Sequence, residues 1–274
     1  MTYVLYHKNC PDGWTAAWVA HNYFGDDNTV RYIPVAYGDE LPEIRDGSVV
    51  FILDFSFSRP ILEELNKRTH LKVLDHHKTA QAALEGLDYC EFDMTRSGAM
   101  LTHNYFNPGF ADKRSPKIVQ YIQDHDLWRH ELPNSVEITN YLRSFPYTFE
   151  AWDAAAEKLD YELSGAVSEG KALLRLEQNL VKRMAEEVQW FWVGGYRVPF
   201  ANATVFFSEV PRELMEKFPD APFAGYYFDR GDGKVQWGLR GRKDGVDVSE
   251  VAKKYGGGGH RAAAGFETKK GEIE

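Results

Sequence analysis

The chain has 274 residues, so one large domain or two domains of ordinary size are expected. Hydrophobic residues make up 43% of it, which is typical of a packed globular protein, and no apolar run is long enough to cross a bilayer. The formal net charge of −9 argues against a long duplex as partner, because duplex binding favours a basic surface. The two cysteines, Cys10 and Cys90, and the lack of an N-terminal signal-like segment predict a cytoplasmic protein.

The N-terminal half alternates short apolar runs with amphipathic segments. We expect strands at 3–7, 30–35, 49–54, 71–75 and 89–92, and helices at 14–24, 59–67, 97–106 and from 116 onward. Strands that alternate with helices in this way predict a doubly wound parallel sheet.

Three of the expected strands end in side chains that bind metals or move protons. The first ends in His7, the third in Asp54, and the fourth in Asp75-His76-His77. In an open parallel sheet, ligands bind outside the carboxyl ends of the strands, so these side chains are expected to meet in one crevice. Each residue alone is also typical of a helix cap, a turn or a satisfied core histidine, but the repetition favours a metal site.

A second acidic and imidazole cluster runs from Asp124 through His125 and Asp126 to Trp128. On the sequence alone it is equally typical of a solvated helix end with a core tryptophan.

The region from 149 to 192 has an almost wholly helical pattern, which is typical of a connector between two domains. Beyond it we expect a smaller mixed α/β domain with strands at 196–200, 204–207, 223–228 and 235–239 and helices at 209–218 and 248–255. The predicted organisation is therefore a first domain at 1–148, a helical linker at 149–193 and a second domain at 194–274.

The run Gly256-Gly257-Gly258-Gly259-His260-Arg261 has few side chains to keep a ligand from the backbone amides. It is followed by residues able to start a helix, and such a loop can bind phosphate or another anion. Flexible linkers have a similar composition, but ordered apolar segments flank this run and favour a binding loop.

Together these motifs resemble the DHH phosphoesterase family with its DHH-associated C-terminal domain. The family includes RecJ-type exonucleases, nanoRNases and pApA phosphodiesterases. The resemblance rests on Asp75-His76-His77 after a strand, on the preceding Asp54, on His7 with Asp12-Gly13, and on Gly257-Gly258-Gly259-His260. It covers nearly the whole chain.

The resemblance implies a fold, a cofactor and a set of site residues. It implies that two Mn²⁺ ions lie in the first domain, which would be catalytic, and that the second domain binds substrate. The implied metal ligands are His7, Asp12, Asp54 as the bridging carboxylate, His76 and Asp124. Asp75 would orient its neighbour and His77 would face the phosphate. The implied substrate residues are Arg240, Gly257, Gly258, Gly259, His260 and Arg261. Ser97 with Gly98 resembles a helix-opening motif beside the site, and Asp126 is the rival of Asp124 as the late ligand.

One departure concerns the first metal site. The family commonly has two aspartates separated by one residue, and here the matching segment reads Cys10-Pro11-Asp12. A thiolate is a softer ligand than a carboxylate, so this site would be weak, different in metal preference or empty.

The predicted function is that of an Mn²⁺-dependent phosphoesterase, exonuclease-like, acting on short single-stranded oligonucleotides or small nucleotide phosphates. An exopolyphosphatase or pyrophosphatase is the nearest enzymatic alternative. A catalytically weak nucleotide-binding sensor is the alternative of another class. Trp14, Trp128 and Trp237 are candidates for base stacking, although core packing explains tryptophans as often. No membrane partner is expected, and a homodimer is left open.

Overall fold

The computed structural model describes residues 1–25, 27–109 and 112–273, and these form two compact units, Met1–Leu174 and Arg175–Glu274. The division falls inside helix α8 (Leu163–Met184). Within the described ranges, no helix is both long and apolar enough to span a membrane.

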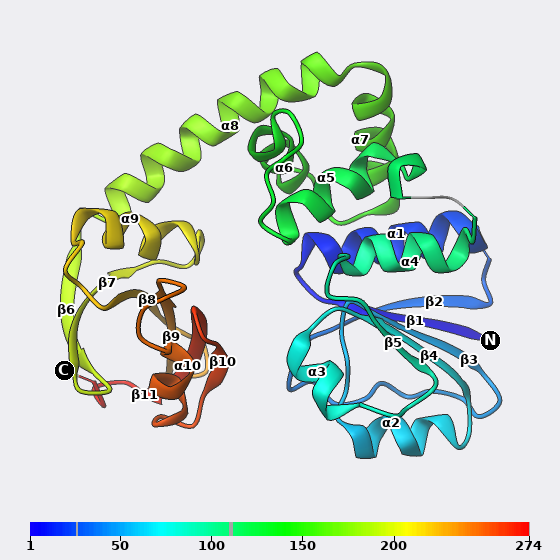
Figure 1. Ribbon diagram of the computed structural model, residues 1–274, viewed down its shortest axis with the longest axis horizontal. Helices are drawn as coiled ribbons and strands as arrows, with labels where there is room; N and C mark the ends of the chain where they lie inside the picture. Colours follow the sequence, from blue (N-terminus) through cyan, green and yellow to red (C-terminus); the bar gives the residue numbers. More distant parts are fainter. Residues whose placement is uncertain (26, 110–111, 274) are drawn as a thin grey trace. The chain divides into compact units, whose positions relative to one another are not determined.

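A five-stranded parallel sheet forms the centre of the first unit, with strand order β2-β1-β3-β4-β5 (Figure 1). The strands are β1 (Thr2–His7), β2 (Val30–Val35), β3 (Val49–Leu53), β4 (His70–Asp75) and β5 (Cys90–Phe92). The helices are α1 (Pro11–Phe24), α2 (Arg59–Asn66), α3 (Lys78–Ala83), α4 (Gly98–Phe106), the 3₁₀ turn η1 (Asp112–Arg114), α5 (Lys117–Asp126), α6 (Ser135–Arg143) and α7 (Phe149–Tyr161).

The helices cover both faces of this sheet. Helices α1 and α4 lie on one face with α5 to α7 packed behind them, and α2 and α3 lie on the other (Figure 1). Alternate residues of β1 supply the two cores: Val4 packs on the α1 side and Leu5 on the α2 side, and both are fully buried. The predicted doubly wound parallel sheet is therefore confirmed. The strand order reverses between β1 and β3, and ligands bind at such a reversal in open α/β sheets.

The second unit contains a mixed six-stranded sheet, with order β10-β11-β9-β8-β7-β6 and one parallel pair, β7 with β8. Its strands are β6 (Val188–Val193), β7 (Tyr196–Asn202), β8 (Phe223–Asp229), β9 (Lys234–Gly241), β10 (Gly258–His260) and β11 (Ala263–Lys269). Helix α10 (Val248–Lys253) packs in the core on one face, and α9 (Glu209–Lys217) packs with the end of α8 in a second core. This smaller mixed α/β unit confirms the predicted fold class.

Three local predictions in this unit were wrong. Residues 188–193 form strand β6 rather than the end of the connecting helix, since β-branched and aromatic side chains favour a strand there. Residues 204–207 form a turn with Phe206 at φ 57°, not a strand. The residues after the glycine run form strand β11 instead of starting a helix.

Candidate metal centre

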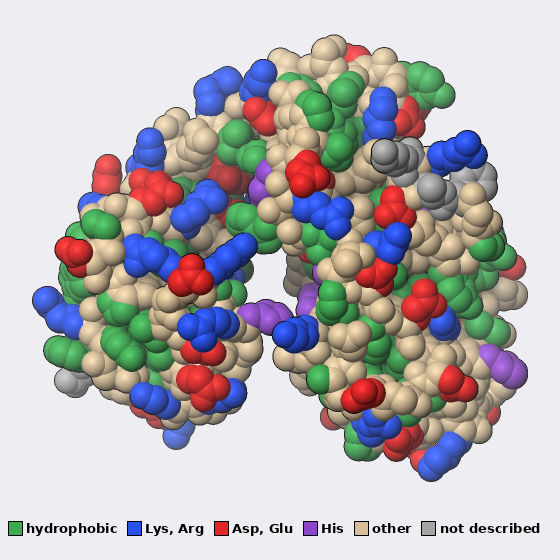
Figure 2. Space-filling model, in the orientation of Figure 1, with side chains coloured by type: hydrophobic (Ala, Val, Ile, Leu, Met, Phe, Trp, Pro, Cys, Tyr) green, Lys and Arg blue, Asp and Glu red, His purple; other side chains and the backbone are tan. Residues whose placement is uncertain are grey.

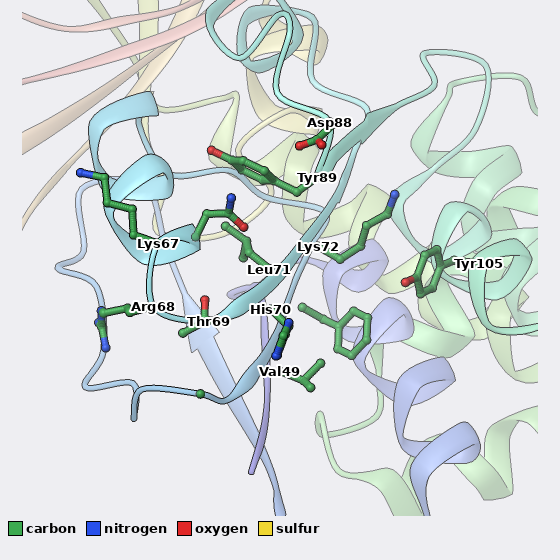
Figure 3. A pocket seen from close by; sticks show the side chains of 13 residues that line it. Val49, Lys67, Arg68, Thr69, His70, Leu71, Lys72, Asp88, Tyr89 and Tyr105 are labelled. Carbon is green, nitrogen blue, oxygen red and sulfur yellow. The ribbon is translucent and has the colours of Figure 1, made fainter.

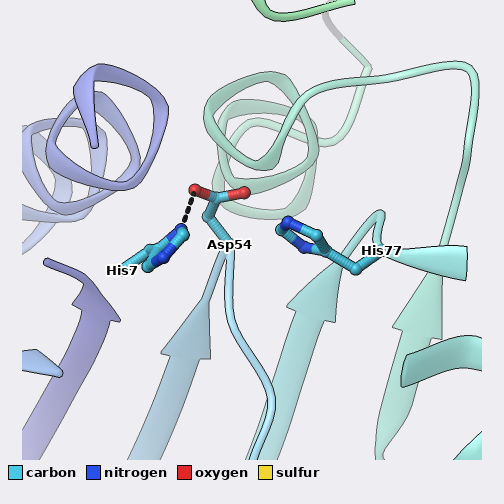
Figure 4. Close-up of side chains that lie close together, drawn as sticks. All are labelled: His7, Asp54 and His77. Atoms are coloured by element: carbon cyan, nitrogen blue, oxygen red, sulfur yellow. Dashed lines mark ion pairs between the residues drawn. The ribbon is translucent and has the colours of Figure 1, made fainter. Parts of the chain in front are cut away.

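The carboxyl ends of three adjacent strands bring the predicted ligands together. His7 ends β1, Asp54 follows β3, and His77 follows the end of β4. Because β3 lies between β1 and β4, Asp54 lies between the two imidazoles (Figure 4). The sequence prediction that these strand ends meet is confirmed by this geometry.

Two groups of possible metal ligands share Asp54. One consists of His7, Asp54 and His77, and the other of Asp12, Asp54 and His76, with all ligand atoms of a group within 4.8 Å of one another. The distance from His7 Nδ1 to Asp54 Oδ2 is 3.4 Å, and that from His76 Nε2 to Asp54 Oδ1 is 3.1 Å. Each oxygen of Asp54 thus faces a different group, as a carboxylate that bridges two cations would.

Two backbone features let the Asp54 side chain lie against the start of α4: the conformation of Asp54 itself and the glycine at position 98. Its backbone has φ 57°, in the left-handed region that non-glycine residues rarely adopt. A Cβ atom on Gly98 would lie 2.4 Å from the Asp54 Cβ, so only glycine lets α4 approach this closely. Asp54 is 1% exposed, and among the described residues the polar neighbours of its oxygens are the imidazoles of His7 and His76, since no backbone amide or hydroxyl donates to it.

The charges of the cluster fit a divalent cation. Burial and the Asp54 carboxylate raise the pKa of Asp126 to about 6, and the same two causes raise the pKa of Asp12. Burial lowers the pKa of His76, but hydrogen bonding and attraction from Asp54 outweigh it and raise that pKa to about 10. Clustered carboxylates and imidazoles that perturb each other in this way are compensated when a cation binds. With nitrogen and carboxylate oxygen as donors, the set suits Mn²⁺ and related ions.

Asp75 holds the backbone of its neighbour His76 and the ring of His77. Its Oδ1 lies 2.7 Å from His77 Nδ1 and accepts the backbone N–H of His76 at 2.7 Å. Ser56 Oγ donates to the other oxygen at 2.5 Å. A carboxylate on Nδ1 fixes the ring and leaves Nε2 for another partner, an arrangement typical of metal-binding histidines. His77 is therefore a candidate ligand as well as a candidate phosphate contact, and Ser56 is a supporting residue that the sequence analysis missed.

Asp12 is held by the start of α4. Its Oδ2 accepts the N–H of Gly98 at 2.6 Å and its Oδ1 that of Ala99 at 3.0 Å, and Oδ2 lies 3.7 Å from His76 Nε2. Ser97 is the N-cap of α4 and its Oγ accepts the N–H of Met100. Ser97 thus acts on the site through the helix whose amides fix Asp12.

The late aspartate requires a correction. Asp126 Oδ2 lies 3.6 Å from His76 Nε2, at the cluster. The preferred residue, Asp124, instead accepts the backbone N–H groups of Glu131 at 2.9 Å and Leu132 at 3.3 Å. These two positions lie two residues apart on α5 and point in different directions, so only one of them reaches the cluster. The structure places Asp126 there and uses Asp124 to hold the following turn.

Cys10 lies near the carboxylates but belongs to neither ligand group. Burial raises the pKa of its thiol well above the usual value, and the Asp54, Asp12 and Asp126 charges raise it further. In the metal-free protein the thiol is therefore neutral at physiological pH, which makes it a poor ligand until a cation displaces its proton.

In the second unit, the predicted substrate residues lie on and beside the sheet. Arg240 on β9 pairs with Ala263 on β11, which pairs with His260 on β10. Directly paired residues point to the same face, so a guanidinium and an exposed imidazole flank a small side chain. Burial lowers the pKa of Arg240, whose Nε and Nη2 lie 3.3 Å from Ser208 Oγ. Neighbouring Gly258 and Gly259 are exposed, and Gly257 directly precedes β10.

Arg261 has a different setting. Its Nε donates to the carbonyl of Lys243 at 3.2 Å and its Nη2 to that of Gly245 at 2.8 Å. The side chain thus holds the loop that follows β9.

A separate cavity of about 790 Å³ lies at the opposite, amino-terminal edge of the first sheet (Figure 3). None of the predicted site residues lines it. Its basic side chains are paired with carboxylates, Lys72 with Glu91 at 2.8 Å and Arg68 with Asp46 at 2.8 Å. The cavity is therefore not part of the metal centre.

Comparisons with known proteins agree with this fold. Residues 207–274 match the DHHA1 domain family. The chain is 30% identical to the uncharacterized protein R106 of Acanthamoeba polyphaga mimivirus, over 96% of this chain and 66% of that protein. It is 28% identical to oligoribonuclease NrnB of Bacillus subtilis, over 96% of this chain and 72% of that protein. The chain thus spans about two thirds of the length of these relatives.

Solved structures with the same fold cover both units. The pGpG-specific phosphodiesterase PggH of Vibrio cholerae matches with a TM-score of 0.53 at 14% identity, over 98% of this chain and 93% of that one. RecJ of Thermus thermophilus in complex with Mn²⁺ matches with a TM-score of 0.51 at 14% identity, over 98% of this chain and 50% of that one. Together these comparisons support the resemblance to the DHH phosphoesterases: the C-terminal part matches the DHHA1 domain, and both units have the fold of PggH and RecJ.

Proposed function

We propose that this protein is a divalent-metal-dependent phosphodiesterase that cleaves short single-stranded oligonucleotides or small nucleotide phosphates, with two Mn²⁺ ions as cofactors. The observation that carries the proposal is that two groups of possible metal ligands share the buried Asp54. In addition, one relative is named an oligoribonuclease and the Mn²⁺ complex of RecJ has the same fold.

The chain's own residues have separable roles in this proposal. His7, Asp12, Asp54, His76, His77 and Asp126 would hold the ions. When bound, the two ions supply positive charge for the phosphoryl oxygens and lower the pKa of the attacking water. The hydrogen bond between Asp75 and Nδ1 of His77 fixes the orientation of the His77 ring. Gly98 and Ala99 keep the Asp12 carboxylate in place through their amides.

The second unit supplies candidate contacts for the rest of the substrate. Arg240 is largely desolvated and its guanidinium can form charge-assisted hydrogen bonds to a phosphate. His260 lies on the same sheet face, two strands away. We assign the predicted substrate role to these two residues and the exposed glycines beside them, and the metal chemistry to the first unit.

A short substrate agrees with the charge of the protein. The net charge is −9, and on the face shown in Figure 2 acidic and basic side chains are interspersed over each unit. A long duplex gains most of its affinity from extended basic surfaces. A substrate with few phosphates depends instead on the ions and on a few local cations.

The test is a substrate panel with Mn²⁺: pApA, short RNA, single-stranded DNA, a nucleoside bisphosphate and polyphosphate. We expect mononucleotide release from pApA or short RNA, and no release by the Asp54→Asn variant. Phosphate release from polyphosphate alone would support the exopolyphosphatase alternative. Dinucleotide binding without turnover would support a sensor and refute the proposed activity.

A further inference from the structure

The turn that follows α5 carries an exposed tryptophan beside the metal centre. Asp126, the last residue of α5, reaches the cluster, and Trp128 follows two residues later. Two residues of chain span at most about 7 Å between Cα atoms. Trp128 is 59% exposed, whereas Trp14 and Trp237 are 5% and 4% exposed. Of the three tryptophans considered for base stacking, Trp128 is therefore the one with an accessible ring.

The backbone of this turn adopts an unfavourable conformation that is held by one residue. Trp128 has φ 53° and His130 has φ 50°, both in the left-handed region. Asp124 accepts four backbone N–H groups of the turn: its carbonyl oxygen accepts those of Arg129 and His130, and its carboxylate those of Glu131 and Leu132. Strained backbone that the surroundings hold in place is typical of functional sites.

Neighbouring side chains fix the indole and anchor the turn to the rim of the cluster. The Trp128 ring lies 5.9 Å from the His125 ring with an interplanar angle of 28°, and 5.5 Å from the His130 ring at 81°. Arg129 Nη2 donates to the carbonyl of Thr95. Thr95 lies three residues before Gly98, whose amide binds Asp12 of the cluster. Both sides of the turn are thus tied to segments that carry or hold metal ligands.

We propose that Trp128 stacks on a nucleobase of the substrate while the adjoining phosphate is at the metal centre. The inference rests on the proposed function. A phosphate bound at the cluster keeps the base of the same nucleotide within one nucleotide's length of the metal centre. The side chain of Trp128, two residues after Asp126, reaches the same region. An indole face accepts any base, so the contact would favour nucleotides over polyphosphate without selecting a sequence.

The test is a thermodynamic cycle in which the Trp128 ring of the protein and the bases of the substrate are removed separately and together. The kcat/KM values of wild type and Trp128→Ala are measured on a dinucleotide and on the same dinucleotide with both bases replaced by hydrogen. In the wild type, base removal is expected to lower kcat/KM about tenfold to a hundredfold, the range for one stacked base. In Trp128→Ala this penalty should fall at least about fivefold, and Trp128→Phe should restore part of it.

Trp192→Ala is the matched control, because Trp192 is 62% exposed and lies on β6 of the second unit. It should keep the wild-type penalty. The same penalty in wild type and Trp128→Ala would overturn the proposal, as would an equal fall in Trp192→Ala. If the wild type hydrolyses neither dinucleotide, the proposed function is refuted. The same cycle measured on dissociation constants then decides the stacking independently.

Discussion

Replacement of Asp54 by asparagine should separate metal binding from folding. Asparagine tolerates the left-handed backbone at φ 57°, whereas alanine there would add about 1–2 kcal/mol of backbone strain. The variant loses attraction to His7 and His76 but also loses repulsion from Asp12 and Asp126. Because these effects oppose each other, we expect the metal-free melting temperature to change by no more than about 3 °C.

The metal-bound state should respond much more strongly. Mn²⁺ at a hundred times its Kd stabilises a protein by about 2.7 kcal/mol. For a unit of this size, 1–174, each kcal/mol corresponds to about 2–4 °C, so wild type should gain about 5–11 °C. Asp54 belongs to both ligand groups, so Asp54→Asn should lose most of this gain and the bound metal. Thermal unfolding with and without Mn²⁺, together with elemental analysis, measures both. A variant that keeps the full gain and two equivalents of metal would refute the bridging role.

Four further variants test other parts of the site. Asp126→Asn should weaken Mn²⁺ binding more than tenfold, whereas Asp124→Asn should weaken it less and lower the melting temperature. Isothermal titration measures which variant binds Mn²⁺ more weakly, and a weaker Asp124→Asn variant would restore Asp124 as the ligand. Gly98→Ala should lower both the melting temperature and the metal content, because the added Cβ meets Asp54 at 2.4 Å; unchanged values would mean that α4 can move away. Cys10→Asp should tighten Mn²⁺ binding and lower the metal-free melting temperature, since it adds a carboxylate to an acidic cluster; an unchanged Mn²⁺ dependence would place Cys10 outside the coordination sphere.

The first unit could be predicted well because its sequence signals are local. Each strand is a short apolar run with a polar residue at its carboxyl end, and the parallel sheet forces those ends together. The prediction failed where two signals overlapped. Val188 continues the helical spacing of α8, yet the aromatic and β-branched residues that follow it pair with β7 and end the helical region.

The orientation of side chains around the cluster could not be predicted in the same way. From the sequence alone, Asp124 and Asp126 are both candidates for the late ligand. Which of them reaches the cluster depends on how α5 is rotated about its axis. That rotation follows from the burial of Ile118, Val119 and Ile122 against the first core, which is a property of the packed structure. Likewise, no sequence signal showed that Ser56 would bind Asp75, because the contact depends on the turn after β3.

The hydrogen bonds of three buried aspartates indicate where the cation is needed. Asp12 accepts two amides at the start of α4, and Asp75 accepts two amides and the Ser56 hydroxyl. Asp54 is equally buried, yet no backbone amide or hydroxyl of the described residues donates to it, and its oxygens face the imidazoles of His7 and His76 at 3.4 and 3.1 Å. An unsatisfied buried carboxylate is costly unless a charge compensates it, and Asp54 is the residue common to both ligand groups. The chain thus supplies amide and hydroxyl donors to the aspartates that position the site, whereas Asp54 faces the imidazoles that we propose bind the metal ions together with it.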